Sequence, residues 1–130
     1  MKSMELLTRR LELFPLDTRL AGEGGQSSLV IGKHRLADLA RKYGTPVYIY
    51  DRATLDHAVE SYRSALAEFY PGSSGITYAG KAFLCLAMAQ WTQQNALWLD
   101  CTGAGELAIA AAAKAPRSNF LVHGVNKSQA

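Results

Sequence analysis

The sequence predicts an α/β fold in which parallel strands alternate with helices. From Val47 onward, short β-branched and aromatic runs alternate with longer stretches whose apolar residues recur at helical spacing. Glycine and proline residues close most of these segments. Such alternation gives a parallel sheet with right-handed crossovers, either open and doubly wound or part of a (β/α)8 barrel. Because a barrel of this kind needs about 250 residues, a chain of 130 residues would hold its first half.

The composition limits the classes of function to be considered. With 48% hydrophobic and 19% charged residues, the chain has the composition of a globular protein, and no apolar run approaches membrane-spanning length. The net charge of +3 comes from scattered basic residues, so we expect no nucleic-acid partner and no membrane partner. Cys85 and Cys101 have neither metal-site nor CxxC spacing, and the first residues lack the apolar region of a signal peptide. We therefore expect a cytoplasmic protein with reduced thiols and no metal site.

The N-terminal part of the chain is predicted to be less regular. We expect a short helix over Glu5–Leu13, a glycine-rich connector over 21–27 and a strand over Ser28–Ile31 that ends at Gly32. A helix over Arg35–Tyr43 follows, and Gly44 is placed to cap its C-terminal end.

The segment 36–44 also resembles the first helix and turn of a helix-turn-helix DNA binder. That motif requires a recognition helix directly after the turn. Here Thr45 and Pro46 lead into Val47–Tyr50, a β-branched and aromatic run that predicts a strand. The DNA-binding interpretation is therefore rejected.

The rest of the chain supplies the alternating elements. Asp51 is placed to cap a long helix from Arg52 to about Phe69, whose apolar stripe comprises Leu55, Val59, Tyr62, Leu66 and Phe69. The elements predicted after it are a strand at Ile76–Ala79, a helix over about Phe83–Gln94 with Leu84, Ala87, Met88 and Trp91 inward, a strand at Leu97–Cys101, a helix from about Gly105 to Ala113, and a strand at Phe120–Val122.

Three ionisable side chains come at or just after the ends of successive predicted strands: Lys81, Asp100 and His123. The chemistry of parallel α/β folds lies at the carboxyl ends of the strands. Lys81 precedes an apolar run without an acidic residue, so we expect its amine to be partly desolvated. Desolvation favours the neutral amine, which attacks aldehydes such as that of pyridoxal phosphate. The convergence of these residues predicts an active site.

Four motifs within residues 29–128 resemble, in order and spacing, the N-terminal part of the diaminopimelate decarboxylase family. This family belongs to the alanine-racemase-like (fold type III) pyridoxal-phosphate enzymes. The motifs are Gly44-Thr45-Pro46-Val47-Tyr48-Ile49-Tyr50-Asp51, Tyr78-Ala79-Gly80-Lys81-Ala82, Asp100 through Gly105-Glu106-Leu107, and His123-Gly124-Val125-Asn126-Lys127-Ser128.

The resemblance implies a role for five residues. Lys81 would hold pyridoxal 5'-phosphate as a Schiff base and move protons during turnover. Asp100 and Glu106 match acidic residues near the cofactor and the lysine. His123 opens the family's His-Gly-Asn-Asn-Lys-Ser motif, and Tyr78 would line the cofactor pocket. Three of them also have a structural alternative: Asp100 as a loop acid, Glu106 as a partner of its helix dipole, and His123 as a hydrogen-bonded structural histidine.

The chain departs from the family pattern at two places and in its length. The loop that is usually Ser-Gly-Gly-Glu reads Gly103-Ala104-Gly105-Glu106, and the Asn-Asn pair reads Val125-Asn126. The family's phosphate-binding glycine segment, its ring-stacking histidine, its acidic partner of the pyridine nitrogen and its substrate cysteine all lie further downstream. We therefore expect this chain to be inactive alone.

The resemblance implies decarboxylation of meso-2,6-diaminopimelate to L-lysine by a homodimer whose subunits share active sites. Residues 1–31 would then belong to the family's second, β-rich domain, and 32–130 to a partial pyridoxal-phosphate-binding (β/α)8 barrel. The alternatives are an ornithine- or arginine-type decarboxylase or a racemase of the same fold, a truncated and inert remnant, and a pyridoxal-phosphate-binding module without turnover.

Overall fold

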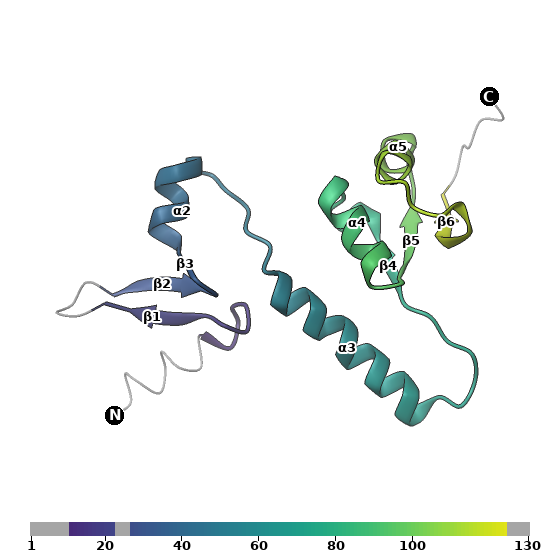
Figure 1. Ribbon diagram of the computed structural model, residues 1–130, viewed down its shortest axis with the longest axis horizontal. Coiled ribbons are helices and arrows are strands. Elements are labelled where there is room, and N and C mark those ends of the chain that lie inside the picture. Colours follow the sequence, from purple (N-terminus) through teal and green to yellow (C-terminus); the bar gives the residue numbers. More distant parts are fainter. Residues whose placement is uncertain (1–10, 23–26, 125–130) are drawn as a thin grey trace. The chain divides into compact units, whose positions relative to one another are not determined.

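The computed structural model describes residues 11–22 and 27–124 and divides the chain into two compact units, Met1–Ala58 and Val59–Ala130 (Figure 1). The division falls inside a helix, and the domain boundary predicted after Ile31 stays a prediction. The predicted helix over Glu5–Leu13 lies almost wholly outside the described residues, as do most of the 21–27 connector and Val125–Ser128 of the last motif. Within the described residues, no helix is long and apolar enough to cross a bilayer.

The first unit contains a small antiparallel sheet in the order β1-β2-β3. The strands are β1 (Arg19–Ala21), β2 (Ser28–Ile31) and β3 (His34–Arg35), with Leu20 opposite Leu29 and Val30 opposite Arg35. The predicted strand at Ser28–Ile31 is confirmed. Its two partners are only three and two residues long, and runs that short carry too little alternation to be recognised in the sequence.

The helix that follows the sheet is α2 (Leu36–Tyr43), one residue shorter than predicted. Gly44 caps it as expected, because its backbone has φ +81° and its N–H donates to the Ala40 carbonyl at 2.9 Å. A positive φ of this kind suits glycine, which carries no Cβ.

The strand predicted at Val47–Tyr50 is not formed. These residues pair with no strand within the described part of the chain, and their side chains are between 39% (Val47 and Ile49) and 89% (Tyr48) exposed. A strand is stable only when a neighbouring backbone completes its hydrogen-bond ladder. The β-branched and aromatic composition of the run therefore gives it a high strand propensity but does not supply a neighbouring strand to pair with.

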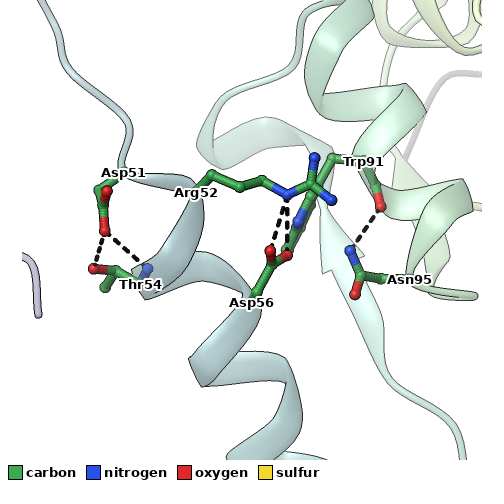
Figure 2. Close-up of polar contacts among 6 residues, drawn as sticks. All are labelled: Asp51, Arg52, Thr54, Asp56, Trp91 and Asn95. Atoms are coloured by element: carbon green, nitrogen blue, oxygen red, sulfur yellow. Dashed lines mark hydrogen bonds and ion pairs between the residues drawn. The ribbon is translucent and has the colours of Figure 1, made fainter. Parts of the chain in front are cut away.

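The long helix α3 (Arg52–Phe69) is confirmed with its predicted bounds. Figure 2 shows Asp51 capping it: one carboxylate oxygen accepts the Thr54 N–H at 2.9 Å and the Thr54 hydroxyl at 2.6 Å. Along the same turn, Arg52 pairs with Asp56 at 3.0 Å, an (i, i+4) ion pair. The capping predicted from the sequence is therefore correct.

The predicted apolar stripe of α3 is largely exposed. Val59 is the only buried member, whereas Tyr62 and Phe69 are 66% and 76% exposed. Helical spacing places apolar residues on one face, but burial also requires an opposing surface. Val59 is almost fully covered, and Leu55 and Leu66 are half-buried.

The second unit carries the predicted parallel sheet, in the order β4-β5-β6. Its strands are β4 (Thr77–Ala79), β5 (Trp98–Cys101) and β6 (Phe120–Val122), joined by α4 (Leu86–Gln94) and α5 (Ala104–Ala112). Short 3₁₀ turns precede α4 and β6, namely η1 (Gly80–Ala82) and η2 (Arg117–Asn119). The α/β alternation with parallel strands is thus confirmed. Helix α4 starts three residues later than predicted, because the backbone is extended at Phe83 and Cys85.

The core of this unit lies between the sheet and the helices α4 and α5. Leu99 and Cys101 point from β5 toward Ala89 of α4 and Ala110 of α5, and all four are at most 1% exposed. The alanines of α5 thus allow the close packing that the sequence predicts. On α4, Met88 and Trp91 are buried as expected, whereas Ala87 is exposed and its predicted inward position is wrong.

Candidate active site

The register of the parallel strands brings Lys81, Asp100 and His123 to one edge of the second unit. Ala79, the last residue of β4, is opposite Asp100 of β5, and Cys101 is opposite Val122, which ends β6. Lys81 follows β4 within η1, and His123 directly follows β6. The structure therefore places all three residues at the carboxyl ends of the strands, where the sequence predicts them.

Asp100 and His123 form a direct side-chain pair across adjacent strands. Nδ1 of the His123 ring is hydrogen-bonded to the Oδ1 oxygen of Asp100. The Asp100 side chain is only 17% exposed and that of His123 is 55% exposed. The backbone N–H of His123 also donates to the Cys101 carbonyl at 3.2 Å. Both the ring and the backbone of His123 are thus held by β5.

Lys81 is exposed, so the predicted partial desolvation of its amine is wrong. The reason is local: the 3₁₀ turn carries Lys81 beyond the end of β4, and the buried residue at this junction is Gly80. A Cβ built on Gly80 would lie 2.8 Å from the Asp100 carbonyl oxygen and 3.7 Å from Cδ of Glu106. The turn that carries Lys81 therefore packs directly against two of the predicted site residues.

Gly80 is a residue that the sequence reasoning did not assign to the site. The signal was present, because an isolated glycine at a strand end often marks a close approach of two backbones. Which backbone approaches it depends on strand order and register, and the sequence does not specify either of them.

Glu106 stands at the start of α5 and binds the preceding loop. Its carboxylate oxygen Oε2 accepts the backbone N–H of Thr102 and, at 3.2 Å, that of Gly103. The contact with Gly103 satisfies the N-cap donor as in a capping box, and the contact with Thr102 satisfies a donor of the preceding loop. Glu106 therefore has a structural role, and its predicted contact with a cofactor stays a prediction.

Tyr78 lies on the opposite face of the sheet from Asp100. It is opposite Leu99 in the register and packs against the core, with its ring edge-on to Trp91 at a centroid distance of 5.9 Å. Its hydroxyl donates to the Phe83 carbonyl at 2.6 Å. The structure thus does not bring Tyr78 to the other predicted residues but ties it to the segment after Lys81, and its place in a cofactor pocket stays a prediction.

A cavity of about 370 Å³ opens on the sheet face that α4 and α5 leave uncovered. Two of its lining residues, Thr77 and Trp98, begin β4 and β5, so it lies toward the amino ends of these strands. It is lined by Ser73, Ser74, Gly75, Thr77, Trp98 and Leu121. None of the predicted site residues is among them. Elsewhere, no three His, Cys, Asp or Glu side chains of residues 11–22 and 27–124 gather as a metal site requires.

Comparison with curated proteins finds clear relatives, although no family model matches the chain. A diaminopimelate decarboxylase of Mycobacterium tuberculosis is 43% identical over 94 residues, which are 72% of this chain and 20% of the relative. That of Mycobacterium leprae is 37% identical over 100 residues, or 77% and 20% of the two chains. That of Bacillus subtilis is 40% identical over 95 residues, or 70% and 20%.

Solved structures share the fold. The diaminopimelate decarboxylase of M. jannaschii matches with a TM-score of 0.73 and 24% identity, over 86% of this chain and 26% of its own. A protein of Aquifex aeolicus matches with a TM-score of 0.69 and 28% identity, over 84% and 26%. The chain spans between 20% and 24% of the length of the curated relatives. Over most of its own length, the chain is therefore a relative of the diaminopimelate decarboxylases and corresponds to a portion of such a protein.

Proposed function

We propose that the protein to which this chain belongs decarboxylates meso-2,6-diaminopimelate to L-lysine and carbon dioxide, and that Lys81 holds its cofactor, pyridoxal 5'-phosphate. The observation that supports the proposal is the 3₁₀ turn that carries Lys81 at the carboxyl edge of the parallel sheet, whose Gly80 packs against Asp100, the partner of His123. The names of the relatives supply the substrate and the reaction. An M. jannaschii relative has been solved with L-lysine, the product expected here.

The residues at this edge fit the attachment of an aldehyde cofactor. Lys81 presents an exposed primary amine on a turn whose base, Gly80, is buried against β5. When bound, pyridoxal phosphate supplies an electron-poor ring that takes up the electron pair left by a departing carboxylate. The family residues that bind the phosphate and the ring lie outside the motifs of this chain, so we assign no phosphate contact here.

Each residue of the edge receives a separate task. The Nζ atom of Lys81 binds the cofactor and afterwards donates or accepts a proton at the reacting carbon. Asp100, with most of its side chain buried, bonds His123 through its carboxylate, and its backbone carbonyl packs against Gly80 in the turn of Lys81. His123 lies next to Asp100 and faces the same edge through its exposed half. Glu106 holds the loop before α5, and Tyr78 braces Phe83 in the segment after Lys81.

The same proposal includes the wider architecture. We assign β4, β5 and β6 with α4 and α5 to a partial (β/α)8 barrel, supported by three sequential parallel strands with one helix between each pair. Residues 1–31 are assigned to a second, β-rich domain, supported by the antiparallel pairing of β1 with β2. A cytoplasmic homodimer completes the assignment, and light scattering of the native gene product would give its oligomeric state.

The proposed role of Lys81 is tested by reductive trapping. The native gene product is incubated with pyridoxal phosphate, reduced with borohydride and mapped by peptide mass spectrometry. We expect the pyridoxyl group on the peptide that contains Lys81, and no label there in Lys81→Arg, which keeps the positive charge but lacks a nucleophilic amine. Lys33→Arg is the matched control, because Lys33 is also exposed and lies in the other unit. Equal labelling of many lysines, unaffected by Lys81→Arg, would contradict the proposal.

A further inference from the structure

The pairing of His123 with Asp100 involves one specific ring nitrogen. Nδ1 meets the Asp100 carboxylate, which when ionised only accepts hydrogen bonds, so Nδ1 carries the proton. Among the residues that the structure describes, none hydrogen-bonds the second nitrogen, Nε2. The ring is also fixed at its base, since the His123 N–H donates to the Cys101 carbonyl.

We propose that Asp100 is a positioning residue that holds His123 as the Nδ1–H tautomer, so that Nε2 is the hydrogen-bond acceptor at the edge where Lys81 lies. A histidine free in water prefers the opposite tautomer, with the proton on Nε2. A carboxylate bonded to Nδ1 reverses this preference, because the hydrogen bond that one ring nitrogen makes decides which of the two nitrogens carries the proton.

The tautomer decides which ligand group His123 recognises. A bare Nε2 accepts a hydrogen bond from an O–H or N–H group and leaves a carboxylate or phosphate oxygen without a donor. The ligand group that faces His123 is therefore a hydroxyl or an N–H donor. This last step rests on the proposed function, whereas the tautomer itself does not.

The tautomer is measured in the native gene product labelled with ¹⁵N in its histidine rings. The ¹⁵N shifts of protonated and bare ring nitrogens differ widely, and His123→Gln assigns the signals. At a pH where the shifts report a neutral ring, we expect Nδ1 to be protonated in the wild type. In Asp100→Ala we expect the major tautomer to change to Nε2–H. Asp100→Asn should also give Nε2–H, because its amide NH2 can turn to donate to an unprotonated Nδ1.

Glu68→Ala is the matched control, because it removes an exposed carboxylate of α3 that contacts neither residue of the pair. It should leave the His123 signals unchanged. An Nε2–H tautomer in the wild type, or an Nδ1–H tautomer that persists in Asp100→Ala, would overturn the proposal. If Asp100→Ala does not fold, the wild-type spectrum alone decides the question.

A double-mutant cycle tests whether Asp100 acts through His123 on the cofactor. We expect Asp100→Ala to weaken pyridoxal-phosphate binding by roughly 2- to 12-fold, the net contribution of one hydrogen bond. Added to His123→Gln, the same substitution should cause no further loss. Additive losses would contradict the positioning role. Failure to bind the cofactor at all would refute the proposed function while leaving the tautomer result intact.

Discussion

Gly80 is the residue on which the packing of the Lys81 turn depends most directly. In Gly80→Ala the new Cβ would meet the Asp100 carbonyl oxygen at 2.8 Å, and this oxygen belongs to the central strand. A backbone atom cannot rotate away as a side chain would, so we expect a loss of about 1–3 kcal/mol in unfolding free energy, the usual cost of overpacking. Urea denaturation measures it.

Gly75→Ala is the matched control for this substitution, because nothing lies within 4 Å of a Cβ built there. We expect little change, or a small gain from the restricted unfolded chain. Equal losses in the two variants would show that the contact with Asp100 has no special importance.

Two substitutions of Glu106 distinguish a structural role of this residue from a role in binding the cofactor. Replacing it with alanine leaves the Thr102 and Gly103 N–H groups without their acceptor, and we expect a loss of about 0.5–2 kcal/mol, as for other helix caps. Glu106→Gln keeps an acceptor oxygen and should recover most of this loss. A cofactor role predicts weaker pyridoxal-phosphate binding in both variants. If binding weakens only as far as stability falls, the cofactor role is contradicted.

For single residues, the sequence predicts their position at the ends of strands better than the exposure and contacts of their side chains. Lys81, Asp100 and His123 lie at the strand ends that hydrophobic patterning indicates. The exposure of Lys81 was not predictable, because it depends on a 3₁₀ turn rather than on composition. The position of Tyr78 against Trp91 depends on which face of β4 the helices cover, and that is set by strand order.

Among the elements, the ends of α2 and α3 were predicted from local signals, and the strand prediction that failed belongs to a run that pairs with no strand in the described part of the chain. The Asp51 cap and the Gly44 cap fix the ends of α3 and α2, and both are encoded within a few residues. The Val47–Tyr50 run has strand propensity but no partner among the described residues, so no strand forms. Local chemistry thus determines helix ends, whereas strands require distant residues.

The two faces of the parallel sheet should differ sharply in their tolerance of truncation. Leu99 of β5 is 1% exposed beneath the helices, whereas Leu121 of β6 is 39% exposed on the other face. We expect Leu99→Ala to cost about 2–5 kcal/mol, the range for buried leucines, and Leu121→Ala to cost much less. Denaturant titration of both variants makes the comparison. Similar losses would mean that the uncovered face is buried in the native protein.

At the scale of the whole molecule, the chain corresponds to a portion of its relatives. It spans between 20% and 24% of its curated relatives, and it carries the lysine with the Asp100–His123 pair beside it. The alternation of strands and helices in the sequence correctly predicted the parallel sheet of the second unit. The residues that would determine the substrate were not predictable here, because the family motifs for phosphate and substrate binding lie outside these residues.

The central claim is that the native gene product is a diaminopimelate decarboxylase that works through Lys81. The most direct test is to follow carbon dioxide release and L-lysine formation from meso-2,6-diaminopimelate with pyridoxal phosphate present. We predict activity in the wild type and in Lys33→Arg, and only background in Lys81→Arg. Full activity in Lys81→Arg, or a preference for ornithine or arginine over diaminopimelate, would contradict the account.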